Sequence, residues 1–516
     1  MIDFNKFLWY NIRSKTCGAS LGGNAAPCSR TDCYIDGCVK MPLQASIFTY
    51  GIINANRIPN PCGFVIDAFI EFIFRRNKIM WTFKSVFYQI YPLGLCGAPF
   101  ENDGVQAHRI LRINDWIAHI KDLGADAIYF SPLFESDTHG YNTRDFFKVD
   151  CRLGTNEDFK KIAINLHKQG IRIVLDGVFN HVGRGFWAFK DVLKNRCESP
   201  YKDWFNINFD GNSPYNDGLW YEGWEGNYDL VKLNLKNEAV INHIFDAIKF
   251  WVDEFDIDGL RLDVAYCLDH DFLRRLRTYT ESLKSEFVLI GELLHGDYRQ
   301  WVNPTMLHSC TNYQCYKGLY SSFNSMNMFE IIHSLKRMFG PEDWCVCRGE
   351  HLLNFADNHD VTRIASILTN EKHLPVLYGM MFGMPGMPCI YYGSEFGVKG
   401  EKSQGDPALR PEIVLPQNTE LTKFISKLAN AFKNSDALVN GNFTEIVLQN
   451  KYCIFERKTD KQRVLVAINA SDEPVTCHFD ARCGTAIDLI TNEKHDFGGG
   501  STLPPYSIQY WDMETV

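Results

Sequence analysis

Short apolar runs alternate with amphipathic segments from residue 86 to about residue 415, and this rhythm constrains the fold more than any other feature of the chain. Clear strand-like runs begin at Val86, Ala127, Ile171, Gly259, Phe287, Leu352 and Cys389, with a weaker candidate at Thr311–Gln314. The intervening segments, such as 114–124 and 240–255, space their apolar residues as a helix does. Repeated strand–helix–strand units favour right-handed crossovers and a parallel sheet. Eight such units predict an α/β fold, the (β/α)8 or TIM barrel.

Three acidic residues close three of these runs. Asp263 follows GLRL, Glu292 follows VLIG, and Asp360 ends the segment LLNFADNHD. An unpaired charge in an apolar setting is costly, so a carboxylate at the carboxyl end of a barrel strand is expected at the mouth of the active site. Carboxyl groups gathered at such a mouth predict the cleavage of glycosidic bonds.

The rhythm also predicts the domain boundaries. Residues 1–79 hold five cysteines and little periodicity before Phe64, which favours a weakly ordered N-terminal extension of unknown role. We expect the barrel over 80–415, with an aromatic-rich subdomain inserted after the third strand at about 182–236. Period-2 apolar patterns then favour a C-terminal antiparallel β-sandwich over 416–516. At least half of the aromatic residues of the insert should pack in its core, and others, such as Trp224, are candidates to stack on sugar rings.

Composition narrows the function classes. The formal net charge of −9 and the pI near 5.9 argue against a nucleic-acid partner and a polybasic membrane surface. No signal peptide is evident, and the longest apolar stretch, 64–74, is interrupted by two acids and is too short to span a bilayer. The 17 cysteines are irregularly spaced, which favours a reducing compartment, so we predict a cytoplasmic protein.

Four segments together resemble a known family. They are DGVFNH (176–181), GLRLDV (259–264), GEL (291–293) and FADNHD (355–360). In order and spacing they are similar to the four sequence blocks of the α-amylase family of retaining glycoside hydrolases, family 13. The segment VKLN, 231–234, resembles a fifth block of the cyclomaltodextrinase and neopullulanase branch. The resemblance implies an α-glucan hydrolase that cleaves α-1,4 bonds in starch, maltooligosaccharides or cyclodextrins through a covalent glycosyl-enzyme intermediate.

The resemblance also implies a role for each acid. Asp263 is the expected nucleophile, Glu292 the acid/base, and Asp360 the residue that holds hydroxyl groups as the sugar ring distorts. Arg261 lies two residues before Asp263 on the same face of its strand, and its charge should keep the nucleophile ionised. Glu292 has no such neighbour in sequence, so we expect a raised pKa suited to proton donation.

The resemblance also implies roles for further residues, each matched individually to the family pattern. The resemblance implies that His181 and His359 hydrogen-bond to sugar hydroxyls and that Tyr141 stacks on the sugar at the cleavage point. Asp176 is expected to orient Arg261 or a neighbour rather than to act on the substrate. A final match, Arg363, is expected to anchor a hydroxyl or the loop near Tyr141.

Some positions depart from the family pattern. Asn142 stands where many relatives have Asp, which weakens a charge contact expected near the non-reducing sugar. Tyr266 and Cys267 replace a Lys-His pair that helps typical α-amylases to bind glucan and calcium. Asn180 matches a calcium ligand of those enzymes, but calcium takes about six to eight oxygen ligands. No cofactor is therefore expected to be required, and calcium stays a possible ligand.

Several alternatives stay open on the sequence. The same acids would serve an α-1,6-acting glucosidase or a transglycosylase, because acceptor choice depends on loops. A catalytically inactive glycan-binding relative is a further alternative, which the intact acids and Arg261 disfavour. Relatives in the neopullulanase branch use an N-terminal β-domain to dimerise, and residues 1–79 do not resemble one. A monomer is therefore the default expectation, with a dimer possible.

Overall fold

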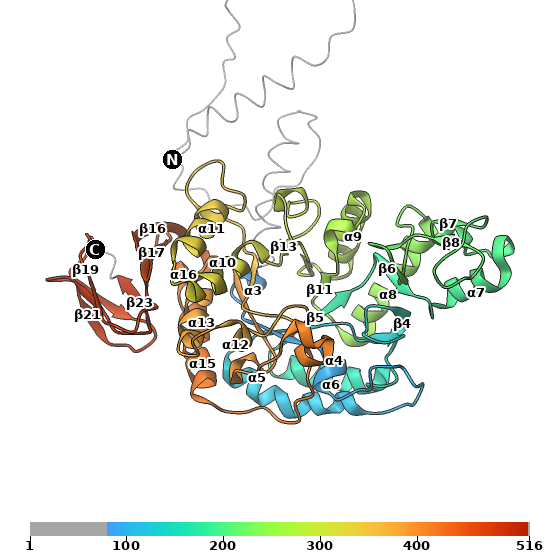
Figure 1. Ribbon diagram of the computed structural model, residues 1–516, viewed down its shortest axis with the longest axis horizontal. Helices are drawn as coiled ribbons and strands as arrows, with labels where there is room; N and C mark the ends of the chain where they lie inside the picture. Colours follow the sequence, from blue (N-terminus) through green and yellow to red (C-terminus); the bar gives the residue numbers. More distant parts are fainter. Residues whose placement is uncertain (1–79, 514–516) are drawn as a thin grey trace, which may run out of the picture. The chain divides into compact units, whose positions relative to one another are not determined.

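The computed structural model describes residues 80–513 (Figure 1). The expectations for the N-terminal extension therefore fall outside the described residues. Within residues 80–513, no helix combines the length and the apolar character needed to cross a membrane. All twelve cysteines of the described part are free thiols.

Eight parallel strands form the central sheet, which confirms the predicted barrel (Figure 1). They are β1 (Phe87–Ile90), β2 (Ala127–Phe130), β5 (Arg172–Gly177), β11 (Gly259–Leu262), β12 (Val288–Gly291), β13 (Ser309–Cys310), β14 (Leu353–Phe355) and β15 (Met387–Tyr391). Their order is β13-β12-β11-β5-β2-β1-β15-β14. A parallel bridge between Thr311 and Leu353 joins the two edge strands, so the barrel is nearly closed. The weak strand candidate at 311–314 corresponds to a strand of the barrel, β13, although β13 ends one residue before that segment.

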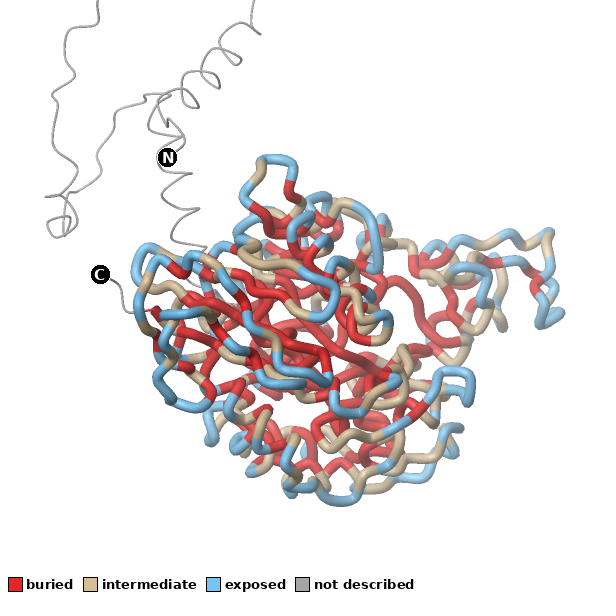
Figure 2. Tube along the Cα trace, turned by 60° about the vertical axis from the view of Figure 1, so that its left-hand side comes forward, coloured by how far each residue is buried: buried red, intermediate tan, exposed pale blue. Residues whose placement is uncertain are grey.

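Both faces of the barrel strands are buried, which explains their continuous apolar runs (Figure 2). Phe87, Tyr129 and Val174 belong to one cluster of buried side chains. Their strand neighbours Tyr88 and Ile128 belong to a second cluster that also contains the apolar faces of the helices. Since side chains alternate along a strand, the two clusters are the barrel interior and the layer beneath the helices.

Helices of the predicted periodicity cover the barrel. The longer ones are α5 (Ile117–Leu123), α6 (Asn156–Lys168), α8 (Glu238–Phe255), α9 (His270–Leu283), α10 (Tyr313–Asn324), α11 (Phe329–Phe339), α13 (His373–Gly383) and α15 (Glu420–Lys433). Shorter elements are α3 (Met80–Phe83), α4 (Pro92–Leu95), the 3-10 helix η1 (Arg109–Trp116), β3 (Phe134–Ser136), β4 (Thr143–Val149), α12 (Ile364–Ile367), α14 (Asp406–Leu409) and α16 (Asp436–Asn440). Side-chain caps fix several helix starts: Thr155 forms a capping box with Asp158, and Asn237 caps α8.

The segment after β5 forms the inserted subdomain. It contains β6 (His181–Gly183), α7 (Trp187–Asn195), β7 (Ile207–Asn208), β8 (Trp220–Tyr221), β9 (Gly223–Trp224) and β10 (Asn227–Lys232). Strand β10 pairs antiparallel with both β6 and β9. It therefore runs beside His181 at the carboxyl end of the barrel before the chain enters α8 (Figure 1).

The C-terminal region is an antiparallel β domain, as the period-2 patterns predicted. Its strands are β16 (Asn442–Leu448), β17 (Tyr452–Lys458), β18 (Arg463–Asn469), β19 (Val475–Cys477), β20 (Thr485–Asp488), β21 (Lys494–Asp496), β22 (Ser501–Leu503) and β23 (Ser507–Met513). Six of them form one sheet and β19 pairs with β22. The first strand begins later than the boundary expected at residue 416, because α15 packs against α5 and α13 as a helix of the barrel.

Candidate active site

A cleft of about 480 Å³ opens at the carboxyl ends of the barrel strands and is lined by Asp263, Glu292 and Asp360. Asp263 directly follows β11, and its backbone N–H donates to Gly177 O on β5. Glu292 directly follows β12, and its backbone N–H donates to Leu262 O. Both acids thus extend the hydrogen-bond ladder of the sheet, which fixes where their side chains enter the cleft.

The Arg261 guanidinium joins the carboxyl groups. Its Nη1 lies 3.0 Å from Asp263 Oδ1 and 3.0 Å from Asp176 Oδ1, and its Nη2 lies 2.7 Å from Glu292 Oε1. Glu292 therefore has a positive neighbour in the fold although it has none nearby in sequence, and its pKa is still raised above the ordinary value, as expected. The neighbour comes from the adjacent strand, since Arg261 is in register with Ile290, two residues before Glu292. The contact between Arg261 and Glu292 could not be predicted from their distance in sequence, because it depends on the parallel pairing of β11 with β12.

The charges of this group are set by burial and by Arg261. Burial raises the pKa of Asp263 and of Glu292 above their ordinary values, and Arg261 lowers the pKa of both. The backbone N–H of Val264 donates to Glu292 Oε2 at 3.1 Å and also lowers its pKa. One guanidinium therefore faces three buried carboxyl groups, including Asp176. This arrangement favours keeping one proton within the group.

The pKa of Asp360 is shifted in the opposite direction, downward. Burial alone would raise its pKa, but His359 and Arg410 lower it well below the ordinary value. His359 Nε2 lies 3.0 Å from one carboxylate oxygen, and Arg410 Nη2 lies 2.9 Å from the other. The Asp360 side chain is still 37% exposed, through the cleft. It is thus an ionised carboxylate available to a ligand.

The rings of Tyr141 and His359 stack on each other beside Asp360. Their rings stack with centroids 5.5 Å apart, and the Tyr141 hydroxyl contacts His359 Nε2 and donates to Asp176 at 3.1 Å. Gln89 Nε2 donates to His359 Nδ1 at 2.8 Å, so the other ring nitrogen, Nε2, is the one that faces Asp360. Tyr141 lines the cleft, whereas Asp176 is buried beneath it.

His181 lies on β6 and Trp224 on β9, and both line the cleft. Burial lowers the pKa of His181 to about 3, so the ring is neutral. His181 Nε2 lies 3.8 Å from Asp263 Oδ2 and has no hydrogen-bond partner among the described residues. The Trp224 ring lies 5.6 Å from the His181 ring and lines the cleft. An unpaired polar nitrogen beside an aromatic face suits a sugar ligand.

Arg363 is not in the cleft. Its guanidinium is fully buried, donates to Tyr392 O and Ser394 Oγ, and stacks on the Tyr391 ring. Its backbone N–H donates to Gly400 O. The structure therefore places Arg363 behind the cleft, where it supports the Asp360 loop and the segment around Gly400, rather than beside a hydroxyl group or Tyr141.

Sequence reasoning missed much of the cleft wall. The missed lining residues are His139, Asn227, Asp229, Leu230, Val264, Leu294, Tyr313, Val361, Lys402, Asp406 and Arg410. Arg410 and Asp406 form an ion pair at 2.7 Å in the loop after the last barrel strand. Opposite charges four residues apart in DPALR were a usable signal, because that loop must lie at the carboxyl end of the barrel. For Leu294 and Tyr313 we find no such signal.

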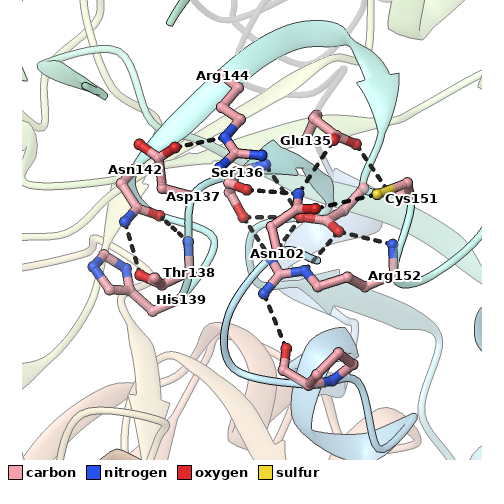
Figure 3. A network of polar contacts seen from close by, with 12 residues as sticks. Asn102, Glu135, Ser136, Asp137, Thr138, His139, Asn142, Arg144, Cys151 and Arg152 are labelled. Atoms are coloured by element: carbon pink, nitrogen blue, oxygen red, sulfur yellow. Dashed lines mark hydrogen bonds and ion pairs between the residues drawn. The ribbon is translucent and has the colours of Figure 1, made fainter. Parts of the chain in front are cut away.

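Asn142, the departure noted from the sequence, is turned away from the cleft. Its side chain is buried and exchanges hydrogen bonds with the backbone N–H and hydroxyl of Thr138, as Figure 3 shows. The amide therefore stabilises its own hairpin loop. The wall near the Asp360 carboxylate is supplied by Arg410 instead.

The donor groups do not fit calcium. The amide nitrogen of Asn180 lies 3.1 Å from His181 Nδ1, inside the barrel mouth. Within residues 80–513, the cluster that could hold a metal ion is Glu135, Asp150 and Cys151, of which Figure 3 labels Glu135 and Cys151. Its carboxylates already accept from Asn102, from the Cys151 backbone and from Arg152, and a thiol is a soft ligand that calcium avoids.

A barrel whose cleft gathers these acids around one arginine is the framework of a glycoside hydrolase. Comparison with family models identifies it further: residues 110–463 match the α-amylase catalytic domain, and residues 443–511 match the C-terminal domain of maltogenic amylase. The chain belongs to the α-amylase family of glycoside hydrolases.

Named relatives agree with this assignment. The intracellular maltogenic amylase of Bacillus subtilis is 31% identical over 443 residues, which are 80% of this chain and 72% of the relative. A cyclomaltodextrinase of Geobacillus thermopakistaniensis is 30% identical over 78% of this chain and 70% of its own. Among solved structures, cyclic α-maltosyl-(1→6)-maltose hydrolase of Arthrobacter globiformis superposes with a TM-score of 0.71 at 27% identity, covering 84% of this chain and all of that one.

Proposed function

We propose that the protein is a retaining α-glucan hydrolase that cleaves α-1,4-glucosidic bonds in maltooligosaccharides, cyclodextrins or starch. The observation that carries the proposal is the bridge from one guanidinium, Arg261, to both Asp263 and Glu292. It brings two carboxyl groups together in the cleft while reducing their repulsion, which is the arrangement that a two-step displacement needs.

The first step transfers the glycosyl group to the enzyme. The Asp263 carboxylate attacks the anomeric carbon, and Glu292 gives its proton to the glycosidic oxygen as the bond to the leaving sugar breaks. We place the proton shared by the buried carboxyl groups on Glu292, because Asp263 must be ionised to attack. Arg261 then stabilises the ionised Asp263 through its 3.0 Å contact.

In the second step Glu292, now a carboxylate, takes a proton from a water molecule. The oxygen of that water attacks the anomeric carbon and displaces Asp263. Two inversions give a product of retained configuration. Asp360 and the free Nε2 of His181 are positioned to hold hydroxyl groups of the reacting sugar. Hydrogen bonds that strengthen as the ring distorts would lower the barrier rather than only the KM.

The relatives' names support the substrate class, since they include maltogenic amylase, cyclomaltodextrinase and neopullulanase. A cytoplasmic location is proposed from the irregular cysteine usage and from the relative named intracellular. An α-1,6 specificity or transglycosylation is the second candidate. The structural match to a hydrolase named for a cyclic α-maltosyl-(1→6)-maltose is the reason to test α-1,6 bonds. A monomer that needs no cofactor remains our proposal.

Product profiles on starch, β-cyclodextrin, pullulan, maltotriose and sucrose test the proposal. We expect hydrolysis of maltotriose and of β-cyclodextrin, with the product released in the α configuration as seen by NMR. Faster cleavage of pullulan at its α-1,6 bonds would transfer the assignment to the second candidate. No turnover of any substrate, with glucan binding intact, would instead make the protein a glycan-binding relative.

A further inference from the structure

Val264, the residue after the proposed nucleophile, has a left-handed backbone conformation. Its φ is 40° and its ψ is 47°. For a β-branched residue this conformation is an outlier that costs free energy, and such outliers persist only where the surrounding structure enforces them. Among the non-glycine residues with positive φ within residues 80–513, Val264 is the one that lines the cleft. The reason for its conformation should therefore lie at the cleft.

Both backbone groups of Val264 are engaged. Its N–H donates to Glu292 Oε2 at 3.1 Å, and its carbonyl accepts from the N–H of Cys267 at 2.8 Å. Alternation along β11 explains the first contact. The N–H of Asp263 bonds to β5, so the next N–H points to the opposite neighbour, β12, which Glu292 directly follows. The left-handed turn then leads the chain into the 3-10 helix η4 (Ala265–Cys267), which leaves one main-chain donor aimed at Glu292.

The two oxygens of Glu292 have different donors. Oε1 lies 2.7 Å from the charged Nη2 of Arg261, whereas Oε2 accepts from the neutral N–H of Val264. A positive charge next to Oε1 disfavours a proton on that oxygen. The proton of the acid form is therefore better placed on Oε2. The two donors also fix the direction of the buried carboxyl group from both sides.

We propose that Val264 is a positioning residue, whose main-chain N–H orients Glu292 Oε2 as the oxygen that gives its proton to the leaving group. This inference rests on the proposed function. When the bond from the anomeric carbon to the glycosidic oxygen breaks, its electron pair stays on that oxygen, the Oε2 proton moves there, and Glu292 becomes a carboxylate. Hydrogen bonds to a charged acceptor are the stronger kind, so the bond from Val264 strengthens as the proton leaves. It therefore lowers the barrier more than it affects binding.

An amide-to-ester replacement isolates this contact. The hydroxy-acid analogue of valine, introduced at position 264 by nonsense suppression, removes the N–H and keeps the side chain. Two substrates report on the acid, because phenyl α-maltoside needs a proton on its leaving group and α-maltosyl fluoride does not. We expect the ester to lower the ratio of kcat/KM for the phenyl maltoside to kcat/KM for the fluoride by about tenfold, the loss of one hydrogen bond to a charged group.

An ester at Leu293 is the matched control. The N–H of Leu293, the residue after Glu292, also donates over 3.1 Å, but to the hydroxyl of Thr311 and not to the acid. This ester should leave the ratio as in the wild type, whatever it does to the melting temperature. An unchanged ratio in the Val264 ester, or an equal fall of the ratio in both esters, would overturn the inference.

Two ordinary substitutions test the left-handed conformation itself. Val264→Gly keeps the N–H but frees the backbone to adopt other conformations, so it should also lower the ratio, whereas the β-branched Val264→Ile should keep it. Equal ratios in these two variants would contradict the role of the conformation.

A separate measurement covers the failure of the proposed function. If the wild type hydrolyses neither substrate, that function fails, and the pKa of the Glu292 carboxyl, followed by NMR of its side chain, decides about the contact. The Val264 ester should raise this pKa, because the N–H lowers it. An unchanged pKa would overturn the positioning of Glu292 by Val264.

Discussion

Arg410 holds Asp360 from the loop after the last barrel strand, with its Nη2 2.9 Å from Asp360 Oδ1. The same side chain donates to His359 O and packs over the Tyr91 ring, so its guanidinium is fixed in place. A residue 50 positions away thus determines the charge and the direction of a proposed catalytic carboxylate.

The first prediction concerns pH. His359 and Arg410 depress the pKa of Asp360, so the ionised form persists to low pH. Arg410→Met removes one of the two causes and should raise the pKa of the Asp360 carboxyl, which NMR of that side chain would follow directly. We also expect kcat/KM at neutral pH to fall by about tenfold or more, because Asp360 loses the hydrogen bond that fixes its direction. Arg410→Lys should recover part of both effects, and an unchanged Asp360 pKa in Arg410→Met would contradict the argument.

The second prediction tests the support behind the Asp360 loop. Ser394 Oγ donates to Asp357 and accepts from Arg363 Nη1, and the Asp357 carboxylate also accepts from Ile364 N, which closes the loop. Ser394→Ala leaves a buried carboxylate short of one donor, at a cost of about 1–3 kcal/mol. We expect a lower melting temperature together with a lower kcat at nearly constant KM. Ser394→Thr keeps the hydroxyl and should restore kcat. A full loss of stability with normal kcat in the folded fraction would assign Ser394 to stability alone.

The third prediction concerns stability at the opposite end of the barrel. Burial would raise the pKa of Asp258, but His167, Lys284 and the Ile173 N–H lower it to about 2. A carboxyl whose pKa is lower in the folded than in the unfolded state stabilises the fold above its unfolded pKa, near 4, and loses this effect as the pH falls through 2. Asp258→Asn should therefore cost about 2 kcal/mol near pH 7. The difference in unfolding free energy should shrink between about pH 4 and pH 2; a pH-independent difference would contradict the linkage.

The barrel could be predicted from the sequence because each strand is a local apolar run, and even the two-residue β13 left a trace next to Thr311. The three acids could be found because Asp263 and Glu292 directly follow such runs and Asp360 comes soon after a third, the run that ends at Phe355. The C-terminal boundary was misplaced, since the periodic helix α15 continues the barrel before β16 starts at Asn442. The sequence does not show which strands and loops meet in the fold: Arg261 reaches Glu292 across a strand pair, and Arg410 reaches Asp360 from the loop after the last barrel strand.

The fourth prediction concerns metal ions. The Asn180 side chain lies against His181, and the carboxylates of Glu135 and Asp150 already have protein donors. We therefore expect EDTA treatment to leave the melting temperature and kcat unchanged. A fall in melting temperature that calcium chloride reverses, and magnesium chloride does not, would show a calcium site that these donors do not reveal.

The last prediction separates the three acids by role. Asp263→Asn keeps the shape of the side chain and removes the attacking charge, so no glycosyl-enzyme adduct should form even from a glycosyl fluoride. Glu292→Gln should behave differently, because a fluoride leaving group needs no proton. With an activated 2-fluoro-sugar, an adduct should then form on Asp263, since attack is intact and only protonation and water activation are lost. Asp360→Asn should slow both activated and natural substrates, because its hydroxyl contacts act whatever the leaving group. Mass spectrometry of peptides from the treated enzyme locates the adduct. An adduct on Glu292, or a product of inverted configuration, would reverse the assignment of nucleophile and acid/base.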